Sequence, residues 1–177
     1  WKDQLQHLEI TRDVASRFNH QMGETFVIPK AKIQENTQNI PGTDGQKMSK
    51  SKNNIINIFL AENKLRKQIM GIQTNSNSVE DTKDPEKCNV FELYSLLAPE
   101  SSTQKLRDLY LEGGMGYGYA KELLFELILD RFYKEREKYD YFHQNPEEVN
   151  IALAKGAKKA RKVARKVLLR VRDKIGF

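Results

Sequence analysis

The sequence predicts a mainly α-helical protein whose second half forms an antiparallel helical bundle. Beyond Cys88, apolar residues recur at three- and four-residue spacing, as they do on one face of an amphipathic helix. Short connections separate these segments, which is typical of antiparallel neighbours. Charged residues make up 31% of the 177 residues and hydrophobic residues 38%, a balance that suits long helices with one solvated face.

The first predicted element is a helix over residues 5–22, which Gly23 can end. Its apolar face has helical spacing and consists of Leu5, Leu8, Thr11, Ala15, Phe18 and Met22. A short strand is expected next, at residues 25–28, where threonine, phenylalanine, valine and isoleucine follow one another and Pro29 stops the run.

The middle of the chain is predicted to be less regular. Residues 35–54 are polar and contain a proline and two glycines, so they indicate a mobile surface loop. A helix is expected from about residue 60 to residue 70. Residues 74–87, which are rich in asparagine, serine, aspartate and lysine, predict a linker with no structure of its own.

Two capping patterns mark the expected helix starts of the bundle. Asn89 with Glu92 precedes one apolar run, and Ser101 with Gln104 precedes the next. An asparagine or serine followed three residues later by glutamate or glutamine is the usual capping-box signature. The four glycines between residues 113 and 118 then predict a turn between helices rather than a phosphate loop, because no strand precedes them.

The final predicted helix is strongly basic. It begins at Asn145-Pro146, which suit the N-cap and the first helical position. Between residues 155 and 174, Asp173 is the single acid among these bases: Lys155, Lys158, Lys159, Arg161, Lys162, Arg165, Lys166, Arg170, Arg172 and Lys174. The apolar stripe expected to face inward consists of Leu153, Ala160, Val163, Ala164, Val167, Leu168 and Val171. Such a helix can bind RNA phosphates, lie on an anionic membrane or simply be solvated.

Composition narrows the class of protein further. A net charge of +6 and a pI of about 9.3 favour a polyanionic partner. Cys88 is the only cysteine, so a disulfide within the chain and a cysteine-based zinc site are excluded, and a reducing cytoplasm is expected. We expect this cysteine to be a small buried apolar residue. No apolar stretch approaches the roughly 18 residues that span a bilayer, so we expect a soluble protein that crosses no membrane.

The candidate functional residues are concentrated in Lys47-Met48-Ser49-Lys50-Ser51. Two ammonium groups can oppose the charge of a triphosphate, and the two hydroxyls and the backbone amides can donate hydrogen bonds to it. A flexible loop of this kind can close over a nucleotide and supply its charges as the α-phosphate is attacked. The alternative is a solvated lysine- and serine-rich loop.

This pentapeptide resembles the second signature of the class I aminoacyl-tRNA synthetases, and it should arise by chance less than about once per million positions. Residues 3–12 read D-Q-x-Q-H-x-E-x-T-R and are similar to a segment of the bacterial tryptophanyl-tRNA synthetases. Tyr117-Gly118 with Lys121 is similar to the Y-G-x-x-K turn in the helical domain of that family. The resemblance covers essentially the whole chain, which looks like the C-terminal half of such an enzyme.

The resemblance implies a remnant of a Rossmann-type α/β catalytic domain over residues 1–58 and a helical anticodon-binding domain over residues 59–177, with the linker inside the latter. It implies a tryptophan–tRNA ligase, which forms tryptophanyl-adenylate and pyrophosphate from tryptophan and ATP and then transfers tryptophan to its tRNA. ATP would enter as a substrate with Mg²⁺, with no prosthetic group and no metal site built by the protein. The family also implies a cytoplasmic homodimer.

Roles in the signature follow from the same resemblance. Lys47 and Lys50 match the lysines that hold the phosphates and act in catalysis. Met48, Ser49 and Ser51 complete the ATP-binding loop.

Four residues outside the signature match further positions of the family. Asp3 matches an acidic residue near the ATP ribose, and Lys2 beside it joins the ATP-binding set. Gln4 matches the glutamine that binds the α-amino group of tryptophan, and Ile40 approximately matches an isoleucine that contacts adenine. Trp1 departs from the family, which has a small glycine there that lets the nucleotide approach.

Beside a synthetase loop, RNA becomes the favoured partner of the final helix, with Lys158, Lys162 and Lys166 as candidate RNA-binding residues. The sequence holds no H-I-G-H-like first signature, so this chain alone is expected to be inactive, with the residues that grip the indole ring upstream. Two alternatives stay open. One is a non-catalytic helical RNA-binding module with a vestigial ATP loop, and the other is the closely related tyrosine-specific ligase.

Overall fold

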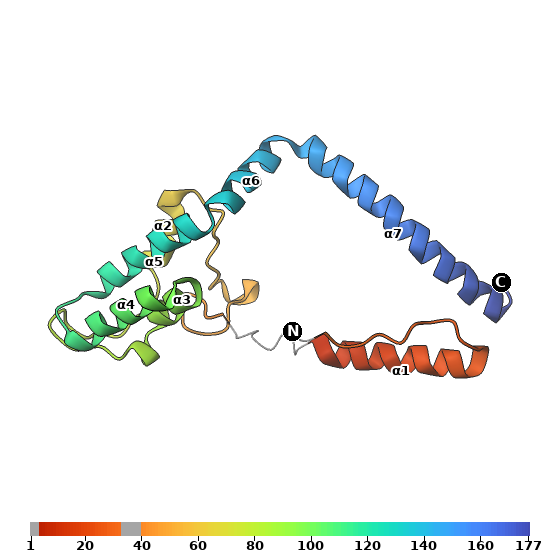
Figure 1. Ribbon diagram of the computed structural model, residues 1–177, viewed down its shortest axis with the longest axis horizontal. Coiled ribbons are helices and arrows are strands. Elements are labelled where there is room, and N and C mark those ends of the chain that lie inside the picture. The colour runs from red at the N-terminus through yellow and green to blue at the C-terminus, as the bar shows by residue number, and fades with distance from the viewer. Residues whose placement is uncertain (1–3, 33–39) are drawn as a thin grey trace. The chain divides into compact units, whose positions relative to one another are not determined.

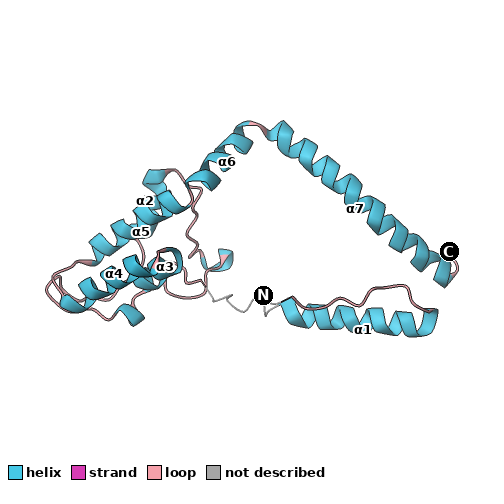
Figure 2. Ribbon diagram, viewed as in Figure 1, coloured by secondary structure: helices cyan, strands magenta, loops and turns pink. Residues whose placement is uncertain are grey.

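The computed structural model describes residues 4–32 and 40–177, and in these ranges the chain is mainly α-helical (Figure 1). The described residues form seven α-helices and two short 3-10 helices, and none of them is assigned to a strand (Figure 2). The mainly α prediction is therefore confirmed. The chain divides into two compact units. One contains α1 (Leu5–Met22) and α7 (Pro146–Ile175), and the other contains the elements from η2 (Lys50–Lys52) to α6 (Tyr133–Gln144).

Helix α1 (Leu5–Met22) has the predicted bounds, but the strand predicted at residues 25–28 is wrong. The side chain of Asn19 takes over the backbone groups that a strand would share with a neighbour. Its Nδ2 donates to Phe26 O at 2.8 Å, and its Oδ1 accepts from Thr25 N at 3.0 Å and Phe26 N at 2.8 Å. Because the local polar groups are satisfied by one side chain, the segment stays irregular.

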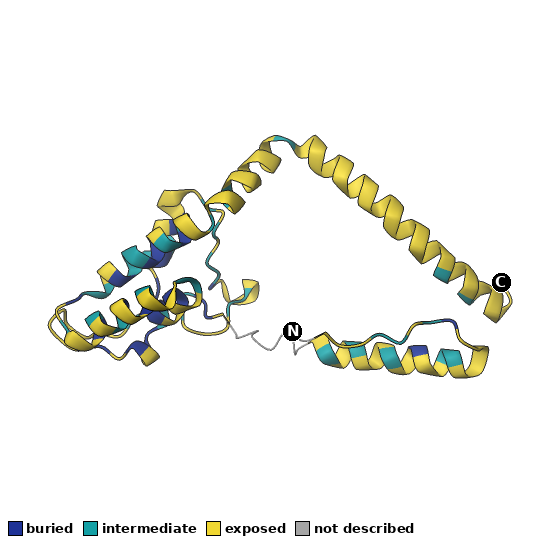
Figure 3. Ribbon diagram, in the orientation of Figure 1, coloured by how far each residue is buried: buried dark blue, intermediate teal, exposed yellow. Residues whose placement is uncertain are grey.

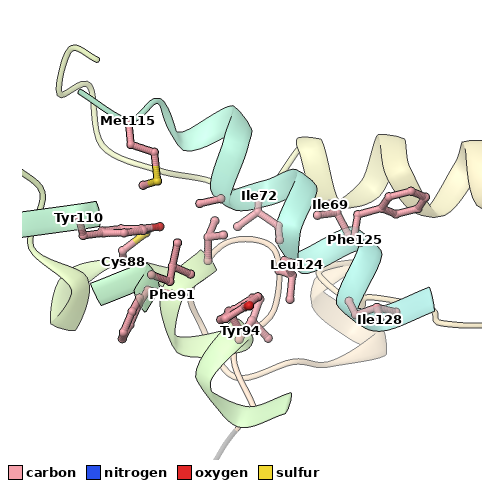
Figure 4. Packing of buried hydrophobic residues seen from close by; sticks show 14 of the residues in the cluster. Ile69, Ile72, Cys88, Phe91, Tyr94, Tyr110, Met115, Leu124, Phe125 and Ile128 are labelled. Carbon is pink, nitrogen blue, oxygen red and sulfur yellow. The ribbon is translucent and has the colours of Figure 1, made fainter. Parts of the chain in front are cut away.

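The second unit is built from five α-helices: α2 (Glu62–Met70), α3 (Asn89–Leu97), α4 (Glu100–Glu112), α5 (Tyr117–Arg131) and α6 (Tyr133–Gln144). Helix α5 packs against both α2 and α3, and its Leu124 is fully buried (Figure 4). Cys88 lies in this core, as predicted, with its Sγ 3.3 Å from the hydroxyl of Tyr110. Burial raises the pKa of Tyr110 far above its ordinary value.

Both predicted capping pairs of the bundle are wrong, because α3 begins one residue earlier and α4 two residues earlier than the pair requires. The N-cap of α3 is Cys88, so Asn89 is already helical, and its side chain donates to Gly42 O instead. The N-cap of α4 is Pro99, whose carbonyl accepts from two backbone N–H groups of the first turn. The Gln104 side chain binds Asp108 one turn further along the helix.

The polar stretch over residues 74–87 is irregular up to the 3-10 helix η3 (Pro85–Lys87), but the expectation that it has no structure of its own is wrong. Lys83 is only 2% exposed in the middle of it. Its ammonium donates to the carbonyl oxygens of Asp81 at 2.7 Å, Ser78 at 2.9 Å and Val79 at 3.2 Å. The Lys83 ammonium therefore organises the backbone of this stretch, since a buried ammonium needs hydrogen-bond acceptors around it.

The predicted turn between helices at the four glycines is confirmed. Gly113 and Gly114 have φ angles of 81° and 75° between α4 and α5, a conformation that glycine adopts without strain. A Cβ at Gly113 would lie 2.7 Å from Glu80 O, so the turn packs directly on the stretch around Lys83. Further along this turn, the hydroxyl of Tyr117 donates to the Asn75 side chain at 2.5 Å.

Helix α7 (Pro146–Ile175) begins where the sequence predicts, but its apolar stripe does not face inward. None of its described residues is buried, and Figure 3 shows it exposed over nearly its whole length. Leu153 is 64% exposed and Leu168 is 48% exposed. The prediction that this stripe faces inward is therefore wrong for the described residues, and only Val167 and Val171 of the stripe are partly covered. Among the described helices, none is long and apolar enough to cross a membrane.

Candidate nucleotide-binding loop

The KMSKS signature lies on a tight turn that begins at Ile40. Pro41 and Lys47 form an isolated antiparallel bridge, and Met48 N donates to Ile40 O at 3.0 Å. Inside the turn, Gly42 N donates to Gln46 O at 2.7 Å. These contacts place the signature at the end of a closed backbone turn, which restricts where its side chains can lie.

The signature itself turns back on its own backbone. Residues Lys50–Lys52 form the 3-10 helix η2, which ends at Asn53 in the left-handed conformation with φ 53°. The hydroxyls of Ser49 and Ser51 lie 2.8 Å apart. The side chains of Lys47 and Lys50 are exposed. The loop therefore presents two ammonium groups and a pair of adjacent hydroxyls to solvent, a set suited to a polyphosphate.

A buried asparagine supports this loop from beneath. Asn54 is 2% exposed, and its Oδ1 accepts from Ser49 N at 2.7 Å. Its Nδ2 donates to Asp44 Oδ1 at 2.7 Å and to Lys47 O at 3.2 Å. Thr43 N donates to the backbone oxygen of Asn54 at 2.9 Å. This one residue thus binds the turn before the signature and the backbone of the signature itself.

An aspartate stands next to this asparagine. The Asn54 amide holds the pKa of the Asp44 carboxyl below its ordinary value, and the Gln46 N–H at 3.0 Å acts in the same direction. Asp44 is therefore ionised at neutral pH. Its carboxylate stabilises the turn by accepting hydrogen bonds from Gln46 N and from the Asn54 side chain.

The other predicted site residues fall in different parts of the chain. Ile40 is 52% exposed and is bonded through its backbone to Met48, so the structure brings it together with the signature. Gln4 is exposed and occupies the N-cap position of α1, in the other unit. Lys2 and Asp3 lie outside the described residues.

The three candidate RNA-binding lysines lie on α7. Lys158, Lys162 and Lys166 are all exposed, and their four-residue spacing puts them on one face of the helix. No group of three or more histidine, cysteine, aspartate or glutamate residues that could hold a metal ion occurs among the described residues.

The sequence pattern did not reveal the residues that support the loop. Asn54 and Asp44 belong to no motif in the sequence, and the pattern around Asn89 predicted a helix cap rather than a contact with the loop. The available signal was Asp44-Gly45, because an Asp-Gly pair is typical of a tight turn. That signal indicates the turn but not the buried asparagine on which it stands.

The family pattern described as tRNA synthetases class I (W and Y) matches residues 2–134. The chain therefore belongs to this family. It is 44% identical over 176 residues to the tryptophan–tRNA ligase of Campylobacter jejuni strain RM1221 and 44% identical over 175 residues to that of Rhodopirellula baltica. Each alignment covers 99% of this chain and 55% of the relative. The chain thus spans about half the length of these curated relatives.

A solved structure is similar to the chain at the same level of sequence identity. The crystal structure of tryptophanyl-tRNA synthetase from Campylobacter jejuni, complexed with ADP and tryptophan, superposes with a TM-score of 0.91 at 44% sequence identity. The match covers 100% of this chain and 56% of that chain. The described fold is therefore shared with a ligand-bound member of the family.

Proposed function

We propose that this chain carries the second ATP-binding loop and the helical tRNA-binding part of a tryptophan–tRNA ligase. The observation that carries the proposal is the KMSKS turn. Its Lys47 and Lys50 side chains are exposed, and its backbone is held by hydrogen bonds to the buried side chain of Asn54. Kinship with tryptophan–tRNA ligases at 44% identity over almost the whole chain supports tryptophan rather than tyrosine as the amino acid.

In the first step, a carboxylate oxygen of tryptophan attacks the α-phosphorus of ATP. The bond from that phosphorus to the bridging oxygen breaks, and pyrophosphate leaves with the bonding electrons. In the second step, a terminal ribose hydroxyl of tRNA(Trp) attacks the carbonyl carbon of the adenylate, and AMP leaves. The ammonium groups of Lys47 and Lys50 oppose the charge that grows on the departing pyrophosphate, and the hydroxyls of Ser49 and Ser51 donate to its oxygens.

The remaining substrate contacts are part of the same proposal. Ile40 contacts adenine beside the loop, Lys2 and Asp3 contact the ATP ribose region, and Gln4 binds the α-amino group of tryptophan. Mg²⁺ enters with ATP as a counterion of the phosphates, which is its usual mode in phosphate-binding sites.

The domain assignment also belongs to the proposal. Residues 1–58 would belong to a Rossmann-type catalytic domain and residues 59–177 to the anticodon-binding domain of a cytoplasmic homodimer. Lys158, Lys162 and Lys166 would contact the tRNA backbone from α7. This role is supported by their exposure and by the basic surroundings of that helix.

The first prediction tests the loop. In a protein of the relatives' full length that carries this chain, Lys50→Ala should slow tryptophan-dependent ATP–pyrophosphate exchange about a hundredfold, because losing one preorganised charge contact costs about 3 kcal/mol in the transition state. Tryptophan binding should change much less. Lys64→Ala removes the same charge from an exposed position on α2 and serves as the control.

An exchange rate within threefold of the parent protein in Lys50→Ala would contradict the catalytic assignment. If binding of tRNA persisted in that case, the alternative of an RNA-binding module with a vestigial ATP loop would be favoured.

A further inference from the structure

We propose that Asn54 and Asn89 are positioning residues of the ATP loop. Asn54 fixes the backbone of the signature at Ser49, and Asn89 fastens the turn beneath it to the first turn of α3. This inference rests on the proposed function and adds to it the two side chains that decide where Lys47 and Lys50 are held.

Asn54 suits this role because it uses both ends of its amide. Its oxygen accepts from Ser49 N, and its nitrogen donates to Lys47 O and to Asp44. The first two contacts lie on either side of Met48, so one planar group fixes the backbone in the middle of the signature. Because the side chain is buried, water cannot replace a contact that is lost. No other residue of this size supplies a neutral donor and a neutral acceptor on two separate atoms.

Asn89 connects the same turn to the helical core. Its Nδ2 donates to Gly42 O at 2.7 Å. Gly42 lies so close to Asn54 that a Cβ on it would approach the side chain and backbone oxygen of Asn54 to 2.4 Å. Val90, the neighbour of Asn89, is fully buried, so this contact starts from a fixed element. A continuous series of contacts therefore runs from α3 through Gly42 and Asn54 to Ser49.

A separate hydrogen bond, between backbone groups, joins the turn to the segment after α2, since Gln73 N donates to Thr43 O at 2.8 Å. The turn thus remains attached when Asn89 is changed, and its unfolding is not the expected result. What should change is the precision of the lysine positions. Displacements of about 1 Å in a catalytic group can cost about a hundredfold in rate.

The test uses Asn89→Asp in the same full-length protein. The aspartate has the shape of asparagine but cannot donate to Gly42 O, and its negative charge is favourable in the first turn of a helix. We expect kcat for pyrophosphate exchange to fall at least tenfold while the KM for tryptophan stays within twofold. We also expect amide hydrogen exchange to accelerate in residues 40–54 but not in α5.

The matched control is Asn63→Asp, the same chemical change in the first turn of α2, where the side chain is exposed. It should leave both kcat and hydrogen exchange unchanged. A second variant, Asn54→Asp, keeps the acceptor for Ser49 N but places a carboxylate against Asp44. It should lower kcat more than Asn89→Asp does.

Three outcomes would overturn the inference. Unchanged exchange in residues 40–54 of Asn89→Asp would mean that this side chain does not hold the turn. Faster exchange with unchanged kcat would mean that the attachment does not position the lysines. A rise in the KM for tryptophan as large as the fall in kcat, with faster amide hydrogen exchange in α5 as well, would indicate general loosening of the fold instead. The hydrogen-exchange result is independent of activity, so failure of the Lys50→Ala test and failure of this inference remain distinguishable.

Discussion

Helices α5 and α7 carry similar sequence patterns and have opposite surroundings. Both have apolar stripes at helical spacing, but Leu124 of α5 is fully buried whereas Leu168 of α7 is 48% exposed. Lysines differ in the same way, because Lys83 is enclosed by three carbonyl oxygens and Lys158 is exposed. The comparison teaches that periodicity predicts a helix and its apolar face, whereas the presence of a partner for that face is a separate question.

The largest expected effect comes from truncating these two leucines in turn. Leu124→Ala should lower the free energy of unfolding by about 3 kcal/mol, because it removes buried methyl groups and leaves a cavity in a packed core. Leu168→Ala should change it by less than about 0.5 kcal/mol, since the side chain is half exposed and alanine is a good helix former. Chemical denaturation followed by near-ultraviolet circular dichroism measures both values.

If Leu168→Ala lowered the free energy of unfolding as much as Leu124→Ala does, the comparison between the two helices would be contradicted. It would mean that the stripe of α7 is covered in solution.

A somewhat smaller effect is expected at Lys83. Lys83→Met keeps the length of the side chain but removes the donor from three carbonyl oxygens, and one or more acceptors would be left unsatisfied. Each buried unsatisfied group costs about 1–3 kcal/mol, so we expect a loss of about 2 kcal/mol in the free energy of unfolding.

Lys166→Met on α7 is the control for this change, and it should cost less than about 0.5 kcal/mol because Lys166 is exposed. Equal stability of the Lys83→Met variant and the parent protein would show that the buried ammonium does not organise residues 74–87. Faster proteolysis within that stretch in the variant would support its role.

Much of the helical fold could be predicted from the sequence, because helix formation depends on local spacing. The bounds of α1 and the start of α7 were predicted correctly from apolar periodicity, Gly23 and Pro146. The N-caps predicted at Asn89 and Ser101 are wrong, because a capping pattern competes with contacts made elsewhere. Asn89 donates to Gly42, 47 residues away, and no local pattern contains that information.

The site shows the same division. The lysines and serines of the signature stand in a contiguous motif, and the exposure of both lysines suits the proposed phosphate-binding role. Asn54 and Lys83 were missed because a buried polar side chain looks like any surface residue in a polar stretch. Their roles depend on which backbone groups the fold brings to them, and composition alone predicts a loop or a linker in both places.

The smallest expected effect on stability concerns α7. Replacing Lys158, Lys162 and Lys166 with glutamine should leave the helix and the free energy of unfolding almost unchanged, because the side chains are exposed and glutamine is nearly as good a helix former as lysine. If this face contacts tRNA backbone, the slope of log affinity against log salt should become shallower by about 0.7 to 0.9 per lost phosphate contact. Discrimination between cognate and other tRNAs should change little, since phosphate contacts position the RNA while base contacts identify it.

The control for that slope replaces Lys64, Lys105 and Lys134 with glutamine, which removes the same net charge from exposed positions of the second unit. A long-range effect of net charge would change the slope equally in both triple variants, whereas direct contact would change it only in the α7 variant. An unchanged slope in the α7 variant would mean that its basic face is solvated, and the contrast between the two units would then concern stability alone.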